Sequence, residues 1–183
     1  MNKLAFVGRF LVVFALVIVV GRASHAPAGY AAMLRAAANV VGPVTNGWWL
    51  ETRAAKTGKP DIWFRRGEND LRLLLSLEAL ALGLLPLLSL IGATPGLGWR
   101  RLVAAVAVGS VALFALDLVV LLLYPLLVLH PNALTDITGT FLGLLTFVGG
   151  PVILWFALTF DRLKAVWRLG PATVAARRKV PSP

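Results

Sequence analysis

The chain of 183 residues is 58% hydrophobic and only 14% charged, which excludes an ordinary soluble domain. Its formal charge of +10 is compatible with nucleic-acid binding, but the Lys and Arg residues lie at the ends of apolar runs and no base-reading motif is present, so nucleic acid is not expected as a partner. The chain has no cysteine, which excludes disulfides, thiol nucleophiles and iron–sulfur clusters held by its own thiolates.

Four apolar runs predict four transmembrane helices, at residues 1–21, 71–92, 102–129 and 140–160. A helix needs about 20 mostly apolar residues to cross a hydrocarbon core of roughly 30 Å. The first run resembles a secretory signal, but we expect an uncleaved anchor because the candidate cleavage site, Ser24-His25-Ala26, is followed by Pro27. The predicted fold class is therefore an all-α membrane protein, a four-helix transmembrane bundle.

The segment 22–70 between the first two spans begins with a predicted amphipathic helix. Its apolar residues recur at helical spacing: Tyr30, Met33, Leu34, Ala37, Val40, Val41 and Val44. Pro27 lies near its start and Gly42-Pro43 near its end, where such residues bound a helix. Two placements remain open, because the helix can lie flat in the outer membrane interface or pack on the protein's own spans.

A β-hairpin is predicted after this helix. Aromatic residues stand on both sides of the connection Lys56-Thr57-Gly58-Lys59-Pro60, and Pro60 fits an edge or the turn itself. The hairpin supplies candidate residues for contact with a partner: Trp48, Trp49, Trp63, Phe64, Arg65 and Arg66. The alternative role of the tryptophans is an aromatic belt at the membrane interface.

The placement of Lys and Arg predicts the orientation. Basic residues cluster in the tail 161–183 and follow Trp99 in a short loop, whereas residues 130–139 contain none, so both termini are assigned to the cytoplasm of a bacterial inner membrane. Candidate contacts with lipid headgroups are Arg100, Arg101, Arg162, Lys164 and Arg168. The extracytoplasmic segment 22–70 itself carries seven basic residues, and only its length of about 50 residues limits their weight, so an inverted topology is the alternative.

Glu78 and Asp117 are the acidic residues deep within the predicted spans. Counting 1.5 Å per residue, Glu78 lies roughly 10 Å and Asp117 roughly 18 Å from the outer ends of their spans, so the two carboxyls can share a proton or face one cavity. One hypothesis is a proton relay or a binding site for a basic group. The other is that each carboxyl is protonated and bonded to a neighbour such as Ser76, Ser110 or a backbone carbonyl.

Other signals for chemistry are weak. His25 and His130 are candidate haem ligands beyond the outer ends of spans one and three, but both resemble interfacial residues without a third ligand, so no metal or cofactor is expected. No hydrolase, phosphate-loop or zinc-protease motif is present, and we do not expect an enzyme.

The last span carries two local features. Gly139-x-x-x-Gly143 places small residues one turn apart, which lets a second helix approach closely. Gly149-Gly150-Pro151 predicts a kink, and Pro86 and Pro125 predict bends in spans two and three.

The layout of the chain resembles the small exosortase-associated membrane proteins. The likeness includes Arg9-Phe10-Leu11 in the first span, the helical stretch 30–41, the hairpin-like segment and three further spans. It implies a non-catalytic accessory or scaffold role in protein sorting beside a larger membrane partner, with no catalytic residue transferred because the chain lacks cysteine. Two alternatives stay open. One is a structural subunit of a respiratory, photosynthetic or transport complex, and the other is a proton-coupled carrier using Glu78 and Asp117.

Overall fold

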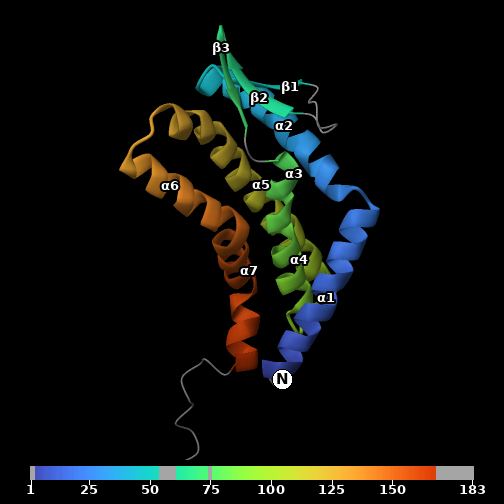
Figure 1. The fold of residues 1–183 in the computed structure, drawn as a ribbon. Helices are drawn as coiled ribbons and strands as arrows, with labels where there is room; N and C mark the ends of the chain where they lie inside the picture. The colour runs from blue at the N-terminus through green and yellow to red at the C-terminus, as the bar shows by residue number, and fades with distance from the viewer. Residues whose placement is uncertain (1–2, 54–60, 74–75, 168–183) are drawn as a thin grey trace, which may run out of the picture.

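The computed structural model describes residues 3–53, 61–73 and 76–167, which form a mostly helical chain with one small sheet (Figure 1). In chain order the elements are α1 (Lys3–Ala23), α2 (Ala26–Thr45), β1 (Trp49–Arg53), β2 (Asp61–Arg66), β3 (Asn69–Arg72), α3 (Leu77–Leu80), the 3-10 turn η1 (Ala81–Gly83), α4 (Leu84–Ala93), α5 (Trp99–Leu129), α6 (Ala133–Leu144), the π-helical segment η2 (Leu145–Gly149) and α7 (Gly150–Trp167).

Three helices in the described part of the chain are long and apolar enough to cross a membrane, so the chain is built as an integral, multi-pass membrane protein. They are Leu4–Ala23, Trp99–Leu129 and Ala133–Lys164. The run expected at 71–92 forms a shorter helical segment, Leu77–Ala93, because its first residues belong to strand β3. The structure therefore confirms a mostly helical fold and supports a membrane protein, but it does not confirm four full spans.

The short segment nevertheless occupies the centre of the helical body. Helix α4 contacts α1, α5 and α7, and its residues Leu87 and Ile91 are fully buried. At its end the indole Nε1 of Trp155 on α7 donates a hydrogen bond to Thr94 Oγ1 at 2.8 Å. The first turn of α1 and the end of α7 lie at the same end of the molecule, opposite the sheet (Figure 1).

Proline and glycine set the breaks in the helices. Pro86 has no N–H to bond the carbonyl of Leu82, and the 3-10 turn η1 lies in this preceding turn. The kink expected at Gly149-Gly150-Pro151 is confirmed by the π-helical segment η2, which ends where the N–H of Gly150, the first residue of α7, bonds the carbonyl of Leu145. The chain changes direction there, between α6 and α7 (Figure 1).

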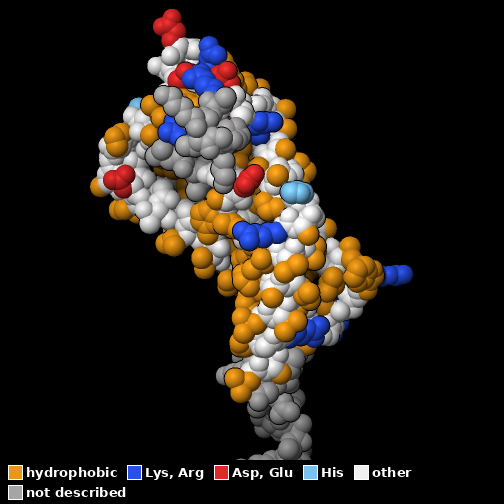
Figure 2. Space-filling model, turned by 45° about the vertical axis from the view of Figure 1, so that its right-hand side comes forward, with side chains coloured by type: hydrophobic (Ala, Val, Ile, Leu, Met, Phe, Trp, Pro, Cys, Tyr) orange, Lys and Arg blue, Asp and Glu red, His pale blue; other side chains and the backbone are white. Residues whose placement is uncertain are grey.

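The sheet is antiparallel with strand order β1-β2-β3. Leu50 pairs with Phe64, and Phe64 pairs with Leu71, so these three residues share one face and pack in a common cluster. The hairpin predicted from sequence is confirmed by β1 and β2, whereas β3 was not expected because Asn69 and Asp70 are residues typical of turns. The hydrophobic side chains spread over the helical body, and the acidic side chains seen on this face lie in the sheet-bearing half (Figure 2).

The contact between η1 and η2 generates a first prediction. A Cβ on Gly83 would lie 2.7 Å from the backbone oxygen of Thr146, whereas a Cβ on Gly143 would meet nothing within 4 Å. We expect Gly83→Ala to lower the free energy of unfolding by about 1–3 kcal/mol, because a rigid backbone must move. Thermal unfolding in detergent measures this difference, and Gly143→Ala, the matched control, should unfold at or above the wild-type temperature. Equal stability of the two variants would contradict the close packing.

Candidate functional site

Helix α2 joins the sheet to the spans through one narrow stripe. Tyr30, Leu34, Ala38 and Gly42 recur four residues apart and are buried. Gly42 permits the closest approach, since a Cβ there would lie 2.4 Å from the backbone oxygen of Trp48. The apolar face expected from sequence divides in two, because Met33, Val40 and Val44 remain 59%, 73% and 86% exposed. The stripe packs on the protein's own spans, and the second set faces away from them.

The central polar contact joins this stripe to α5. The Tyr30 hydroxyl donates a hydrogen bond to Oδ2 of Asp117, and the carboxyl is fully buried. Phe114 lies one turn earlier on α5, with its ring edge-on to Tyr30 at a centroid distance of 5.5 Å. The second oxygen, Oδ1, and the hydroxyl of Thr146 are both buried without a hydrogen-bond partner in the described part of the chain. Asp117 thus has one acceptor atom satisfied and one free.

The protonation of Tyr30 follows from its surroundings. Burial raises the pKa of the phenol, and the hydrogen bond to Asp117 and the carboxylate charge raise it further. The hydroxyl therefore keeps its proton and acts as the donor. Sequence reasoning selected Asp117 but missed Tyr30, which lies 87 positions away in the chain. The sequence offered one signal: Tyr30, Leu34, Ala38 and Gly42 recur four residues apart and so lie on one face of the predicted helix.

Two further contacts fix the sheet on α2. Asn39 bonds both backbone groups of Leu50: its amide nitrogen donates to the Leu50 carbonyl at 3.1 Å, and its Oδ1 accepts from the Leu50 N–H at 2.6 Å. Arg35 donates to Thr52 Oγ1 at 2.6 Å. The side-chain amide therefore takes the place of a neighbouring strand along the outer edge of β1.

An aromatic stack fixes the sheet on α5. The rings of Phe64 and Tyr124 lie 5.6 Å apart and nearly parallel. Phe64 is buried, as are Trp48 and Leu50 in the same cluster. These residues lie on the inner side of the sheet, so Trp48 and Phe64, expected to be available to a partner, serve the protein's own core.

The outer face of the sheet carries charges of both signs and two tryptophans, Trp49 and Trp63. Arg53 bonds Asp70 at 2.7 Å and Glu51 at 3.1 Å, and Arg65 reaches Glu51 at 3.5 Å. The guanidinium of Arg53 also lies 5.0 Å from the ring centroid of Trp63. The hydrogen bonds that Arg53 donates to Asp70 and Glu51 raise the pKa of its guanidinium. Because these pairs stay partly exposed, we attribute to them a fixed arrangement of side chains and little stability.

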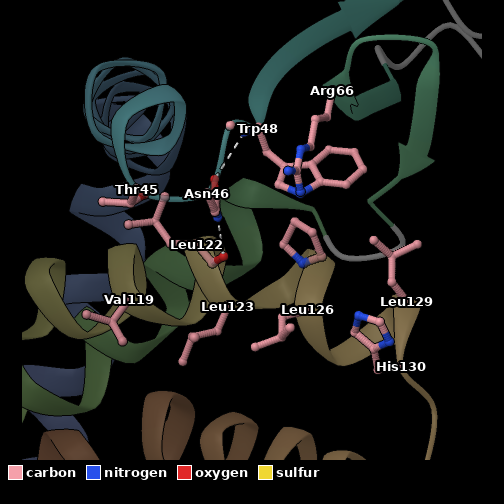
Figure 3. A pocket seen from close by; sticks show the side chains of 12 residues that line it. Thr45, Asn46, Trp48, Arg66, Val119, Leu122, Leu123, Leu126, Leu129 and His130 are labelled. Carbon is pink, nitrogen blue, oxygen red and sulfur yellow. Dashed lines mark hydrogen bonds between the residues drawn. The ribbon is translucent and has the colours of Figure 1, made fainter.

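A cavity of about 690 Å³ lies below the other side of this sheet, beside the second half of α5 (Figure 3). Leucines of α5 line one wall, and the chain around Asn46 and Trp48 lines another. Asn46 holds the walls together: its amide nitrogen donates to the Leu122 carbonyl at 2.9 Å and its Oδ1 accepts from the Trp48 N–H at 3.1 Å. Arg66, from the end of β2, and His130, just after α5, also line the cavity (Figure 3). Sequence reasoning had noticed both residues without connecting them.

Glu78 and Asp117 are not brought together, which corrects the expectation of a buried acidic pair. Glu78 is exposed on the short helix α3 and lines a separate cavity of about 390 Å³ with Arg35 and Ser76. It is not buried because α3 begins only at Leu77, after the sheet, so Glu78 lies in the first turn of the helical segment. Asp117 instead bonds Tyr30.

The two histidines lie near opposite ends of α2. His25 is exposed at the α1–α2 junction with φ 53°, and His130 lines the cavity that Thr45 also lines. A helix of about 20 residues separates these places by roughly 30 Å. They cannot ligate one haem within this chain, and no cluster of three potential metal ligands occurs among the described residues.

The remaining candidates lie away from the sheet. A Cβ on Gly139 would meet only Leu127 Cδ1, at 3.9 Å, so within the described chain no helix uses the Gly139–Gly143 face for close packing. Arg100 and Arg101 are exposed at the start of α5, and Lys164 is exposed on α7. Arg162 shares a small cavity with Arg101 and Asp161, and its buried Nε has no described partner. Arg168 lies outside the described residues.

Comparison with protein-family models, with curated proteins and with solved structures finds no match for this chain.

The Tyr30–Asp117 bond generates a second prediction. We expect Tyr30→Phe to lower the free energy of unfolding by about 1–3 kcal/mol, because the buried carboxyl then loses its donor. Asp117→Leu should also destabilise, but the double variant should cost less than the sum of the two, since neither polar group is left unpaired. Chemical or thermal unfolding in one detergent completes this double-mutant cycle. Strict additivity would show that the two groups are not coupled.

Proposed function

We propose that this protein is a non-catalytic accessory of a larger membrane protein, to which it presents the outer face of its sheet, defined by Trp49, Glu51, Arg53, Trp63, Arg65 and Asp70. The observation that carries the proposal is the way the sheet is held. Asn39 and the Phe64–Tyr124 stack fix its position on α2 and α5, while the outer face keeps exposed aromatic and charged groups. A small rigid sheet of this kind gives a binding surface without a large loss of conformational freedom on association.

The chemistry of this face fits a protein partner. Tryptophan and arginine are the residues that most often dominate the energy of protein interfaces, and here Arg53 lies over Trp63. Ion pairs with Glu51 and Asp70 hold Arg53 in one place. The sheet thereby offers a preorganised aromatic and cationic site surrounded by carboxylates, which favours a partner of mixed charge.

The proposed orientation places the sheet outside a bacterial inner membrane and both termini in the cytoplasm. It is supported by the shared end at which α1 begins and α7 ends, and by Arg101 and Arg162, which line one cavity beside the last turns of α7. We infer that Leu77–Ala93 completes a four-helix bundle as a fourth, thin crossing. Its central position among α1, α5 and α7 supports this, and its length lies at the lower limit of about 17 residues for a span.

The proposed partner class is an exosortase-type membrane sorting enzyme, on the resemblance in layout described above. A small subunit of another membrane complex would use the same face. The separate surroundings of Glu78 and Asp117 favour either form of accessory over a proton-coupled carrier, which needs both acids on one path.

Replacing the outer tryptophan tests the proposal. We expect Trp63→Ala to reduce the amount of partner recovered after gentle detergent extraction on the order of tenfold or more, because a central interface tryptophan is lost. The matched control is Trp99→Ala, since Trp99 is 76% exposed at the opposite end of the molecule. Identification of the recovered chain by mass spectrometry separates a cysteine sorting enzyme from a subunit of a respiratory, photosynthetic or transport complex.

Two results would overturn the proposal. One is recovery of the wild-type protein as a lone chain from its own membranes. The other is an equal loss of partner with Trp63→Ala and Trp99→Ala, which would indicate general damage or contact elsewhere.

A further inference from the structure

The cavity beneath the sheet has one cationic and one apolar side. Arg66 and His130 are both among the residues that line it, while the wall formed by α5 from Val119 to Leu126 is aliphatic (Figure 3). No Asp or Glu is among the residues that line it. Its volume of about 690 Å³ falls within the range of small-molecule binding sites, about 300–1,000 Å³.

The position of Arg66 is set by its surroundings. The residue ends strand β2, and its Nε would lie 3.3 Å from a Cβ built on Gly47. Gly47 has φ +75°, a backbone conformation that residues other than glycine rarely adopt. Because glycine has no Cβ, this position leaves room for the guanidinium. Arg66 forms no ion pair with the described residues, in contrast to Arg53 and Arg65 on the outer face. A cation that has no acidic partner among the described residues and lines a cavity without Asp or Glu favours an anion.

The basic and apolar lining residues lie at different depths along α5. His130 follows the last residue of the helix, and Val119 lies about ten residues earlier, roughly 15 Å further along the span. The basic lining residues therefore lie at the end of the span, and the aliphatic wall runs inward toward the middle of the bilayer. Leu126 and Val119 are 55% and 49% exposed, so this wall is open from the side. A phospholipid has the same polarity over the same depth, with a charged headgroup at the interface and chains below it.

We propose that the cavity binds one anionic membrane lipid, with its phosphate at Arg66 and His130 and an acyl or prenyl chain along Val119–Leu126. The amide of Asn46 stands between these parts and is occupied by Leu122 and Trp48. It therefore fixes the two walls relative to each other and leaves recognition of the headgroup to the guanidinium and the imidazole.

Photolabelling of the full-length protein tests the site. The protein is placed in phosphatidylcholine nanodiscs that contain a trace of phosphatidic acid with a diazirine near the end of one acyl chain. We expect adducts on residues 119–126 that excess unlabelled phosphatidic acid removes and excess phosphatidylcholine does not. Arg66→Gln should lower the labelling about fivefold, the effect of one basic group near a membrane surface.

Arg65→Gln is the matched control, because Arg65 is the preceding residue of the same strand and lies on the other face of the sheet. Arg66→Lys keeps the charge and should retain most of the labelling. If the Arg66→Gln variant does not fold, substitutions on the aliphatic wall test the site instead. Val119→Trp fills the cavity and should abolish the adducts, whereas Val111→Trp, an exposed position on α5 outside the cavity, should not.

Three results would overturn the proposal. Equal competition by phosphatidylcholine would reduce the site to ordinary boundary lipid. Loss of the adducts with inorganic phosphate alone would indicate a small-anion site without a lipid chain. Equal labelling of the Arg66→Gln and Arg65→Gln variants would show that the guanidinium takes no part.

Discussion

The hydrogen bond between Tyr30 and Asp117 is the constraint on which the arrangement of the membrane and sheet portions depends. A carboxyl within an apolar span is costly without a partner, and α2 supplies that partner from outside the span. Once Tyr30 is fixed on α5, the rest of the α2 stripe follows along the same helix face. The end of α2 is then brought to Leu122, where Asn46 makes the next contact. One polar bond thus sets the direction in which the helix leaves the membrane body.

In the helical body, glycines allow neighbouring helices to pack closely, because they have no Cβ. Gly83 brings the backbone of η1 against η2. Gly150 brings the start of α7 against α5, where a Cβ would lie 3.0 Å from Leu116 Cδ2. Between spans in lipid the hydrophobic effect supplies little force, so close backbone packing carries more of the association. The irregular turns η1 and η2 therefore mark places where two spans meet.

Sequence reasoning predicted the apolar runs, the amphipathic helix, the hairpin and the kink near Gly150, because each depends on local composition or spacing. It did not predict contacts between residues that are far apart in the chain. Asp117 was selected for its charge, but its partner Tyr30 belongs to another element, and Arg66 and His130 are joined only by the fold. Glu78 was placed too deep because strand β3 takes up residues that composition alone assigns to a span. Helix boundaries and long-range pairs are both decided by tertiary contacts.

The pairing of Asn39 with Leu50 also bears on how the sheet behaves toward other chains. The open edge of a sheet is a template for added strands and for aggregation, and natural proteins protect such edges. Here the carboxamide already occupies both backbone groups of Leu50 on β1, and Arg35 covers Thr52 next to it. Strand addition is therefore directed to the edge formed by β3, where Asn69 and Asp70 disfavour a long extended partner. The helix that positions the sheet therefore also limits pairing of the β1 edge with another chain.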